Sequence, residues 1–277
     1  MEITLKELKC AHVKLKALLP RSQTVLGFLW QTLKSSQSDP VKIFVNQWPD
    51  FSVVVCKPLC QQEGDSFKDI LVFAKDEVRL EEMIRNNVLF DWSKYFCIGT
   101  NLDNRRTFSA VASEKHISCR YLAVCNMLIL RDMSHLPDVN CAGITLGSLD
   151  ESHIEMVNRT WKFGQKGSLR MIQNMVRNFP SCCVLDEGGR PVSWVLTYAS
   201  SAMGMLYTTP EHRGKGYAKV VVSALAKRLF TEGYPVYCFI EEENTVSHQL
   251  FKRLGFTVEP LCKEAWFDFT PNTGAFT

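Results

Sequence analysis

The amino-acid sequence predicts an α/β fold in which helices cover a mixed β-sheet. The first observation is the second half of the chain, where segments with helical spacing of apolar residues alternate with short apolar runs. The second is a similar alternation in the first half. The third is composition, because 277 residues that are 46% hydrophobic and 22% charged are typical of a globular protein. At roughly 150 residues per domain, this length suggests about two domains.

The first half begins with a predicted amphipathic helix, whose apolar face is formed by Leu5, Leu8, His12, Leu15 and Leu19. The same segment contains Glu2 and Glu7, and mitochondrial presequences avoid acidic residues. We therefore expect it to be the first helix of the folded domain. Segment 24–33 fits a helix or a strand. The next predicted elements are strands at 42–48, 52–56 and 69–74 and a helix at 78–85, followed by a strongly apolar run at 120–130.

The second half has clearer signals. The predicted elements are helices at 154–161 and 168–178, strands at 182–186, 191–198 and 203–208, a helix at 216–231, a strand at 236–241 and a helix at 245–254. Asp150 is suited to cap the first of these helices, and the Gly188-Gly189 pair predicts a hairpin between the first two strands. We place the boundary between two domains, 1–140 and 143–277, in the mixed segment between them.

Charge and cysteine content exclude several classes of protein. The net charge of +3 is too small for a nucleic-acid-binding surface over the whole chain, so we expect no nucleic-acid partner. No apolar run reaches the ~18 residues that a membrane span needs. The 11 cysteines lack the paired spacing of a zinc site or a disulfide framework, so we expect reduced thiols and no bound metal. Cys182 and Cys183 are expected to be buried in a strand.

The segment from Leu206 to Ala218, LYTTPEHRGKGYA, carries the most specific chemistry. Arg213, Gly216 and Ala218 fit the pattern R-x-x-G-x-A between a strand and a helix. The first N–H groups of a helix have no intrahelical partner and, together with the helix dipole, they bind anions such as a pyrophosphate. The pattern is neither a Walker A loop nor a Rossmann fingerprint. A simple tight turn between strand and helix is the alternative interpretation.

The surroundings of this loop resemble the GNAT acyltransferase superfamily, whose R/Q-x-x-G-x-G/A loop binds the pyrophosphate of acyl-CoA. A closer resemblance, to the glycine N-acyltransferase family, extends over both halves. The segments that carry it are NQWPDFSVVV (46–55), VNRTWKFG (157–164), NFPSCCVLDEGGRPVSW (178–194), TTPEHRGKGYA (208–218) and TEGYPVY (231–237). The resemblance implies a GNAT fold with a diverged GNAT-like domain in the first half.

The resemblance also implies an activity and a set of contacts. The enzyme would transfer an acyl group from acyl-CoA to the amine of glycine or another amino acid, directly in a ternary complex, and acyl-CoA would be a co-substrate rather than a permanently bound cofactor. The implied CoA-binding residues are Leu206, Tyr207, Thr208, Arg213, Gly214, Lys215, Gly216, Tyr217, Ala218 and Asn244. We expect a monomer located in mitochondria, with the cytoplasm or the endoplasmic reticulum as alternatives.

Two positions that carry catalytic groups in related proteins depart from the family pattern. Family members can carry a glutamate as general base at the position of Ala202, and many GNAT enzymes carry a tyrosine as proton donor at the position of Phe251. Glu241 and His248 are the candidate replacements for the base. Other candidates are Glu211, His212, Glu242 and Glu243. For each carboxylate, a solvated surface charge is the alternative interpretation.

Two other functions remain open at this stage. The same fold could acetylate a polyamine or a protein amine, which the acidic run from Glu241 to Glu243 would favour. Because Ala202 and Phe251 lack ionisable groups, the chain could instead bind acyl-CoA without catalysing transfer.

Overall fold

A computed structural model describes residues 1–34, 41–59, 69–86 and 89–271. The elements of the first half are α1 (Leu5–Lys16), α2 (Gln23–Lys34), β1 (Val41–Val45), β2 (Val53–Pro58), β3 (Ile70–Ala74), α3 (Glu77–Asn86), β4 (Phe96–Asn101), α4 (Arg105–Glu114) and β5 (Ile117–Ile129). The ambiguous segment 24–33 is therefore helical. The predicted opening helix is present, and its Leu8 and Leu15 are buried, whereas Leu5 is exposed.

The second half continues with β6 (Thr145–Gly147), α5 (Ile154–Thr160), α6 (Leu169–Asn178), β7 (Cys182–Leu185), β8 (Pro191–Thr197), β9 (Met203–Thr208), α7 (Tyr217–Thr231), β10 (Tyr237–Glu241), α8 (Thr245–Arg253) and β11 (Thr257–Pro271). Every helix and strand that the sequence predicted here is present. Asp150 accepts a hydrogen bond from Ser152 N and caps a short 3-10 turn, Glu151–His153, which leads into α5.

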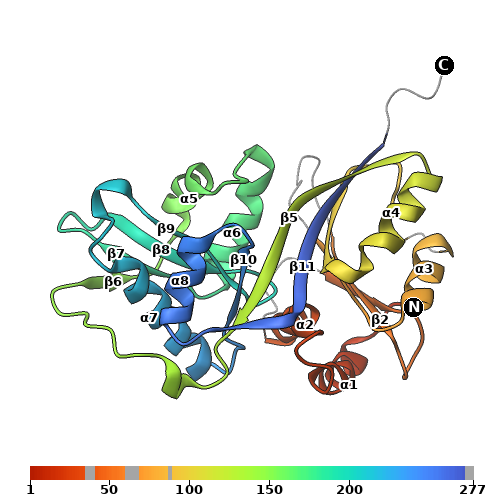
Figure 1. Cartoon of the computed structure of the whole chain (residues 1–277), viewed down its shortest axis with the longest axis horizontal. Coiled ribbons are helices and arrows are strands. Elements are labelled where there is room, and N and C mark those ends of the chain that lie inside the picture. Colours follow the sequence, from red (N-terminus) through yellow and green to blue (C-terminus); the bar gives the residue numbers. More distant parts are fainter. Residues whose placement is uncertain (35–40, 60–68, 87–88, 272–277) are drawn as a thin grey trace.

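The strands form one 11-stranded mixed sheet, which confirms the predicted α/β class. Its order is β1-β2-β3-β4-β11-β5-β10-β9-β8-β7-β6. The two halves share one pattern of pairing: three antiparallel strands, β1 to β3 or β7 to β9, and then a parallel strand, β4 or β10. Figure 1 shows the two halves side by side, each with its own helices, and the long strands β5 and β11 between them.

The last strand of each half pairs with the other half. β5 pairs with β10 through Cys125 and Glu241, and β11 pairs with β4 through Trp266 and Gly99. β5 and β11 also pair with each other, so the sheet is continuous across both halves. The connection between β5 and β6 coincides with segment 131–147, where we placed the boundary. The division into domains 1–140 and 143–277 remains a prediction, because backbone pairing joins the halves.

Four elements of this arrangement were absent from the prediction: β4, α4, β6 and β11. β11 was missed because Glu264 and Asp268 interrupt its apolar pattern, although both residues are buried in the structure. Each has a specific partner, since Thr24 donates a hydrogen bond to Glu264 and Arg120 forms an ion pair with Asp268. A charged residue can be buried in a strand when a partner from a distant segment bonds to it. The hydropathy of the strand segment alone does not reveal such a partner.

Helices cover both faces of the second half of the sheet. Alternation along β7 turns Cys182 and Val184 toward the cluster around α7, whereas Cys183 faces the cluster around α5 and α6 together with Trp194. The predicted burial of the two cysteines is thereby confirmed. Burial raises the pKa of the Cys182 thiol to about 12 and that of Cys183 to about 11, so both are weak nucleophiles at neutral pH.

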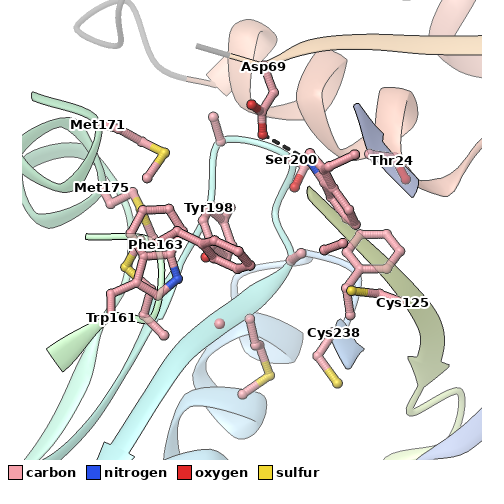
Figure 2. Close-up of a pocket in the computed structure, with 18 of the residues that line it drawn as sticks. Thr24, Asp69, Cys125, Trp161, Phe163, Met171, Met175, Tyr198, Ser200 and Cys238 are labelled. Carbon is pink, nitrogen blue, oxygen red and sulfur yellow. Dashed lines mark hydrogen bonds between the residues drawn. The ribbon is translucent and has the colours of Figure 1, made fainter. Parts of the chain in front are cut away.

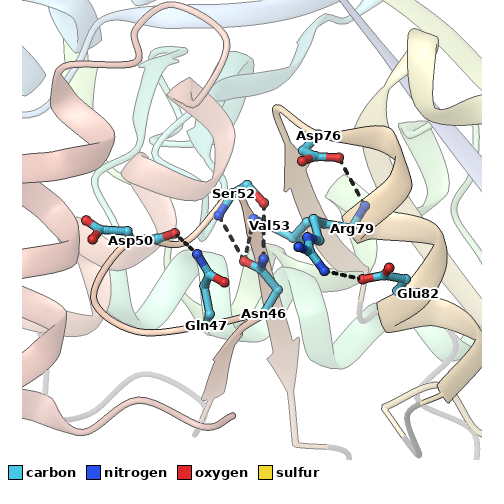
Figure 3. A network of polar contacts seen from close by, with 8 residues as sticks. All are labelled: Asn46, Gln47, Asp50, Ser52, Val53, Asp76, Arg79 and Glu82. Atoms are coloured by element: carbon cyan, nitrogen blue, oxygen red, sulfur yellow. Dashed lines mark hydrogen bonds and ion pairs between the residues drawn. The ribbon is translucent and has the colours of Figure 1, made fainter.

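A polar network closes the turn between β1 and β2, within the segment NQWPDFSVVV. The side-chain oxygen of Asn46 accepts hydrogen bonds from the backbone N–H groups of Ser52 and Val53, each at 2.9 Å. Its amide nitrogen donates to Ser52 Oγ, and Gln47 donates to the backbone oxygen of Asp50 (Figure 3). The family-like residues of this segment therefore stabilise a turn at the far edge of the sheet.

Candidate functional site

A cavity of about 450 Å³ lies where β9 and β10 separate. These neighbouring strands are parallel, and only Met203 and Cys238 are in register between them. Beyond that pair, residues of both strands line the cavity, from Gly204 to Tyr207 and from Phe239 to Glu241. The volume falls within the range of pockets for small ligands, ~300–1,000 Å³.

The backbone of β9 is irregular where it lines this cavity. Trp194 pairs with Tyr207 and Leu196 with Gly204, so Met205 and Leu206 together lie opposite one residue of β8. This is a β-bulge, and Met205 has a φ of 52°, a left-handed value that costs energy for a residue with a side chain. Bulges leave backbone groups outside the sheet ladder, where they can bind a ligand.

One wall of the cavity is aromatic and sulfur-rich. Figure 2 shows Trp161, Phe163, Met171 and Met175 gathered there, with Tyr198 beside them. The rings of Trp161 and Phe163 are edge to face, with centroids 5.5 Å apart. Aromatic and thioether side chains form favourable contacts with aromatic rings. The wall is therefore suited to hold a bulky or aromatic group.

The predicted anion-binding loop leads from β9 into α7. Gly214 and Gly216 adopt left-handed φ values of 77° and 81°, and a Cβ at either position would meet open space. Arg213 Nε donates to the backbone oxygen of Thr208, 3.1 Å away, and its guanidinium remains exposed. The start of α7 is thus open to solvent and flanked by positive charge, as binding of a pyrophosphate requires.

The structure divides the ten predicted CoA contacts into two groups. Leu206, Tyr207 and Asn244 line the cavity. The others lie outside it, at the end of β9 and the start of α7: Thr208, Arg213, Gly214, Lys215, Gly216, Tyr217 and Ala218. The side chain of Asn244 also caps α8, because its oxygen accepts from Ser247 N at 3.1 Å. The two groups mark the two ends that an elongated CoA molecule would contact.

Glu241, one of the two candidate bases, lines the cavity but already has a cationic partner. Lys162 Nζ lies 2.7 Å and 2.8 Å from its two carboxylate oxygens. This contact raises the pKa of Lys162. Because the ion pair engages both carboxylate oxygens, Glu241 is less available to a substrate amine.

The second candidate base, His248, is not among the described residues that line the cavity. Its Nε2 atom is buried and forms no hydrogen bond within the described part of the chain. Ala202 lines the cavity and is buried, so the position of the expected glutamate holds a methyl group. Phe251 is 4% exposed and packs edge to face on Phe256, which confirms its predicted place in the core.

The remaining candidates lie outside the cavity. Glu242 is exposed and forms an ion pair with Lys263, 2.6 Å apart. His212 bonds to Thr209 beside the start of α7, and neither Glu211 nor Glu243 lines the cavity. In the part of the chain that the structure describes, no cluster of three or more metal-ligating side chains occurs. Among the same residues, no helix is long and apolar enough to cross a membrane.

Sequence reasoning missed one carboxylate that lines the cavity, Asp69 at the start of β3. Trp266 Nε1 donates to its Oδ2 atom at 2.9 Å, and both Trp266 and the nearby Cys97 lower the pKa of this carboxylate. Burial nevertheless raises the pKa of Asp69 above its usual value. No local motif identifies this residue, because its neighbours in the cavity come from distant parts of the chain.

The sequence profile of the aralkyl acyl-CoA:amino acid N-acyltransferase family matches residues 3–180, and that of FR47-like proteins matches residues 183–267. Rat glycine N-acyltransferase is 26% identical over 282 residues, which cover 94% of this chain and 95% of the rat protein. Bovine glycine N-phenylacetyltransferase is 26% identical and covers 88% of this chain and 91% of its own.

Solved structures show the same fold. An X-ray structure of a Drosophila protein matches 99% of both chains with a TM-score of 0.82 at 16% identity. A GCN5-related N-acetyltransferase from Kribbella flavida matches 92% of this chain and 95% of its own with a TM-score of 0.56 at 12% identity. These similarities confirm the predicted GNAT fold. Since the family profile covers more than half of the sequence, the chain belongs to the aralkyl acyl-CoA:amino acid N-acyltransferase family.

Proposed function

We propose that this protein transfers an acyl group from acyl-CoA to the amine of glycine or another amino acid, giving an N-acyl amino acid and free CoA. One observation carries the proposal: a largely apolar cavity lies at the gap between β9 and β10, and β9 leads from it to the exposed, positively flanked start of α7. A pyrophosphate at α7 and a pantetheine arm along β9 would deliver the thioester to the cavity.

The acyl group that fits best is aromatic or otherwise bulky. The wall of Trp161, Phe163, Met171 and Met175 offers contacts to a flat ring. Family membership points the same way, because the family is described by its aralkyl acyl-CoA substrates. Benzoyl-CoA and phenylacetyl-CoA are therefore the first donors to test, with glycine as the first acceptor.

Direct transfer within a ternary complex accounts for the groups present. The amine nitrogen attacks the thioester carbonyl carbon, a C–N bond forms, and the C–S bond breaks to release CoA thiolate. Backbone N–H groups at the bulge of β9, around Leu206, would stabilise the oxyanion. An acyl-cysteine intermediate is disfavoured, because burial raises the pKa of Cys125 and Cys238, the thiols on the strands beside the gap.

The test is release of CoA by the full chain from benzoyl-CoA, phenylacetyl-CoA, acetyl-CoA and fatty acyl-CoAs against a panel of amino acids. Turnover with an aromatic acyl-CoA and glycine is expected. Turnover of acetyl-CoA with spermidine, and none with amino acids, would instead identify a polyamine acetyltransferase. No turnover with any pair would refute the proposal.

A second candidate function is binding of acyl-CoA without catalysis. The absence of ionisable groups at Ala202 and Phe251 favours it. Calorimetry separates the two functions, because tight CoA binding without transfer would identify a binding protein. In both cases Arg213→Glu should weaken CoA binding about tenfold or more, whereas Lys227→Glu, the same charge change near the other end of α7, should not.

For location and assembly we propose a mitochondrial monomer, based on the family resemblance. Cell fractionation with an antibody to this chain, and light scattering of the purified protein, test the two statements separately. Recovery of the protein in the cytoplasm or the endoplasmic reticulum would refute the first statement. A stable dimer would refute the second.

A further inference from the structure

We propose that Asp69 is the general base of the transfer reaction and that it replaces the carboxylate absent at Ala202. The first half of the chain would then supply a catalytic group to a site built mainly by the second half. This inference rests on the proposed function, because it assigns the proton acceptor for the attacking amine. Its experiment is designed so that failure of the inference and failure of the proposed function give different results.

Strand register places Asp69 on the face of the sheet that forms the cavity. Leu71 of β3 pairs with Gly99, which pairs with Trp266, and all but Gly99 line the cavity. Asp69 precedes Leu71 by two residues, and side chains two positions apart in an extended chain point to the same face. The ring of Trp266 lies edge to face with Phe239 of β10, with centroids 5.3 Å apart. One indole therefore separates Asp69 from the strand beside the gap.

A hydrogen bond fixes the position of the Asp69 carboxylate on the cavity wall. Trp266 holds Oδ2 of Asp69 at 2.9 Å, so the side chain has a defined direction. Figure 2 shows Asp69 above the turn that contains Ser200, and this turn continues directly into Ala202. Asp69 and Ala202 thus approach the same part of the cavity from opposite halves of the molecule.

The electrostatic surroundings favour Asp69 over Glu241 as the proton acceptor. Glu241 has a lysine at 2.7 Å, whereas no lysine or arginine within residues 1–34, 41–59, 69–86 and 89–271 forms an ion pair with Asp69. The titratable groups around Asp69 are Cys97, Tyr95 and Tyr198, and burial raises the pKa of each, so they are neutral at neutral pH. The ammonium group of an incoming amino acid would supply the missing positive charge.

Burial gives Asp69 a second property of a base. An acceptor works best when its pKa lies near the working pH, and burial moves the pKa of Asp69 upward in that direction. The contacts with Cys97 and Trp266 act in the opposite sense and lower this pKa. The effect of burial is larger, so the carboxylate is more basic than an exposed aspartate.

The reaction moves two protons away from the substrate nitrogen. The ammonium group of the amino acid gives one proton to Asp69, and the neutral amine attacks the thioester carbonyl carbon. When the C–S bond breaks, the second proton lost by the nitrogen is taken up with the leaving thiolate, giving CoA thiol. Asp69 then returns its proton to water, and the product is the neutral amide.

The experiment compares kcat and kcat/KM for CoA release by the full chain between pH 5 and 9, for wild type, Asp69→Asn and Glu241→Gln. Asp69→Asn should lower kcat about 10²-fold or more and remove the acidic limb of the pH profile, with CoA affinity by calorimetry unchanged. Glu241→Gln should lower kcat less than tenfold. The matched control is Glu264→Gln, which changes a buried carboxyl outside the cavity lining, and its kcat should stay within about twofold of wild type.

A second variant covers the case in which Asp69→Asn folds poorly, as judged by circular dichroism. Asp69→Glu keeps the carboxylate and displaces it by one methylene group, so it should retain an acidic limb with a shifted midpoint and a reduced kcat. If the wild-type protein is active and either Asp69 variant shows the same kinetics and pH profile as wild type, the assignment of Asp69 as the base is wrong, while the proposed function stands. Loss of turnover in Glu241→Gln but not in Asp69→Asn would assign the base to Glu241. An inactive wild type would overturn the proposed function itself.

Discussion

Trp266 Nε1, in the last strand of the second half, donates a hydrogen bond to Oδ2 of Asp69 in the first half, across 2.9 Å in space and 197 residues in sequence. The contact exists because β11 lies between β4 and β5 and brings Trp266 beside the start of β3. The same indole lines the cavity. Because β5 and β11 each pair with a strand of the other half, Asp69 of the first half contacts Trp266 and lines the cavity.

Replacement of Trp266 by phenylalanine should shift the pH dependence of activity. The indole N–H lowers the pKa of Asp69, so its loss should raise that pKa further. If the ionised carboxylate is the base, the acidic limb of the kcat/KM profile should move to higher pH. The matched control is Trp92→Phe, since the indole N–H of Trp92 has no hydrogen-bond partner among the described residues. Equal shifts in the two variants would contradict this role of Trp266.

Glu264→Gln should stabilise the protein at alkaline pH. Burial raises the pKa of Glu264 to about 8 from its ordinary value of 4.5, and the group accepts a hydrogen bond from Thr24. The folded state therefore holds the proton more tightly than the unfolded state, so the contribution to stability is complete below about pH 4.5 and is lost as pH rises through 8.

Glutamine does not ionise, so the Glu264→Gln variant does not lose stability as the pH rises through 8. Since one pKa unit corresponds to about 1.4 kcal/mol, and the new amide N–H₂ must be accommodated in a buried site, we expect a gain of about 1–3 kcal/mol in the free energy of unfolding at pH 8. Urea unfolding of wild type and variant at pH 5 and pH 8 measures it. A difference between the two proteins that is the same at both pH values would argue against a titrating Glu264.

Gly216→Ala should weaken CoA binding through the backbone. Its φ of 81° is left-handed, so a Cβ introduces strain of about 1 kcal/mol and disturbs the start of α7. Gly189→Ala is the matched control, because Gly189 has a φ of 76° at the β7–β8 turn and a Cβ there also meets open space. Both variants should melt at lower temperature, but calorimetry should show reduced CoA affinity only for Gly216→Ala. Equal CoA affinity in the two would mean that the loop is only a turn.

Met171→Trp should narrow the cavity and change acyl selectivity. Met171 is half-buried on the aromatic wall, so a larger side chain occupies the volume proposed for the acyl ring. We expect kcat/KM for benzoyl-CoA to fall about tenfold relative to acetyl-CoA, since a misfit of this size in an apolar pocket is worth about 1–3 kcal/mol. The ratio of the two substrates provides the internal control. An equal loss for both would point to general disruption of the site.

The sequence predicted the parts of the site that depend on neighbouring residues. The hairpin around Gly189 and the loop through Gly214 and Gly216 are local structures, in which a few residues determine the backbone conformation. The absence of a carboxylate at Ala202 was also visible from the sequence, through comparison with the family pattern. The family pattern showed neither the ion pair between Lys162 and Glu241 nor the burial of the His248 Nε2 atom.

By itself, the sequence determined the α/β class, nearly all elements of the second half and the anion-binding loop, because periodicity and turn chemistry act over a few residues. Only the tertiary structure decided which strands exchange partners, where the cavity lies and which carboxylates face it. Asp69, Trp266 and Tyr198 meet through pairing of strands that are far apart in the chain. Such contacts depend on the free energy of the whole packed sheet, and no single segment encodes them.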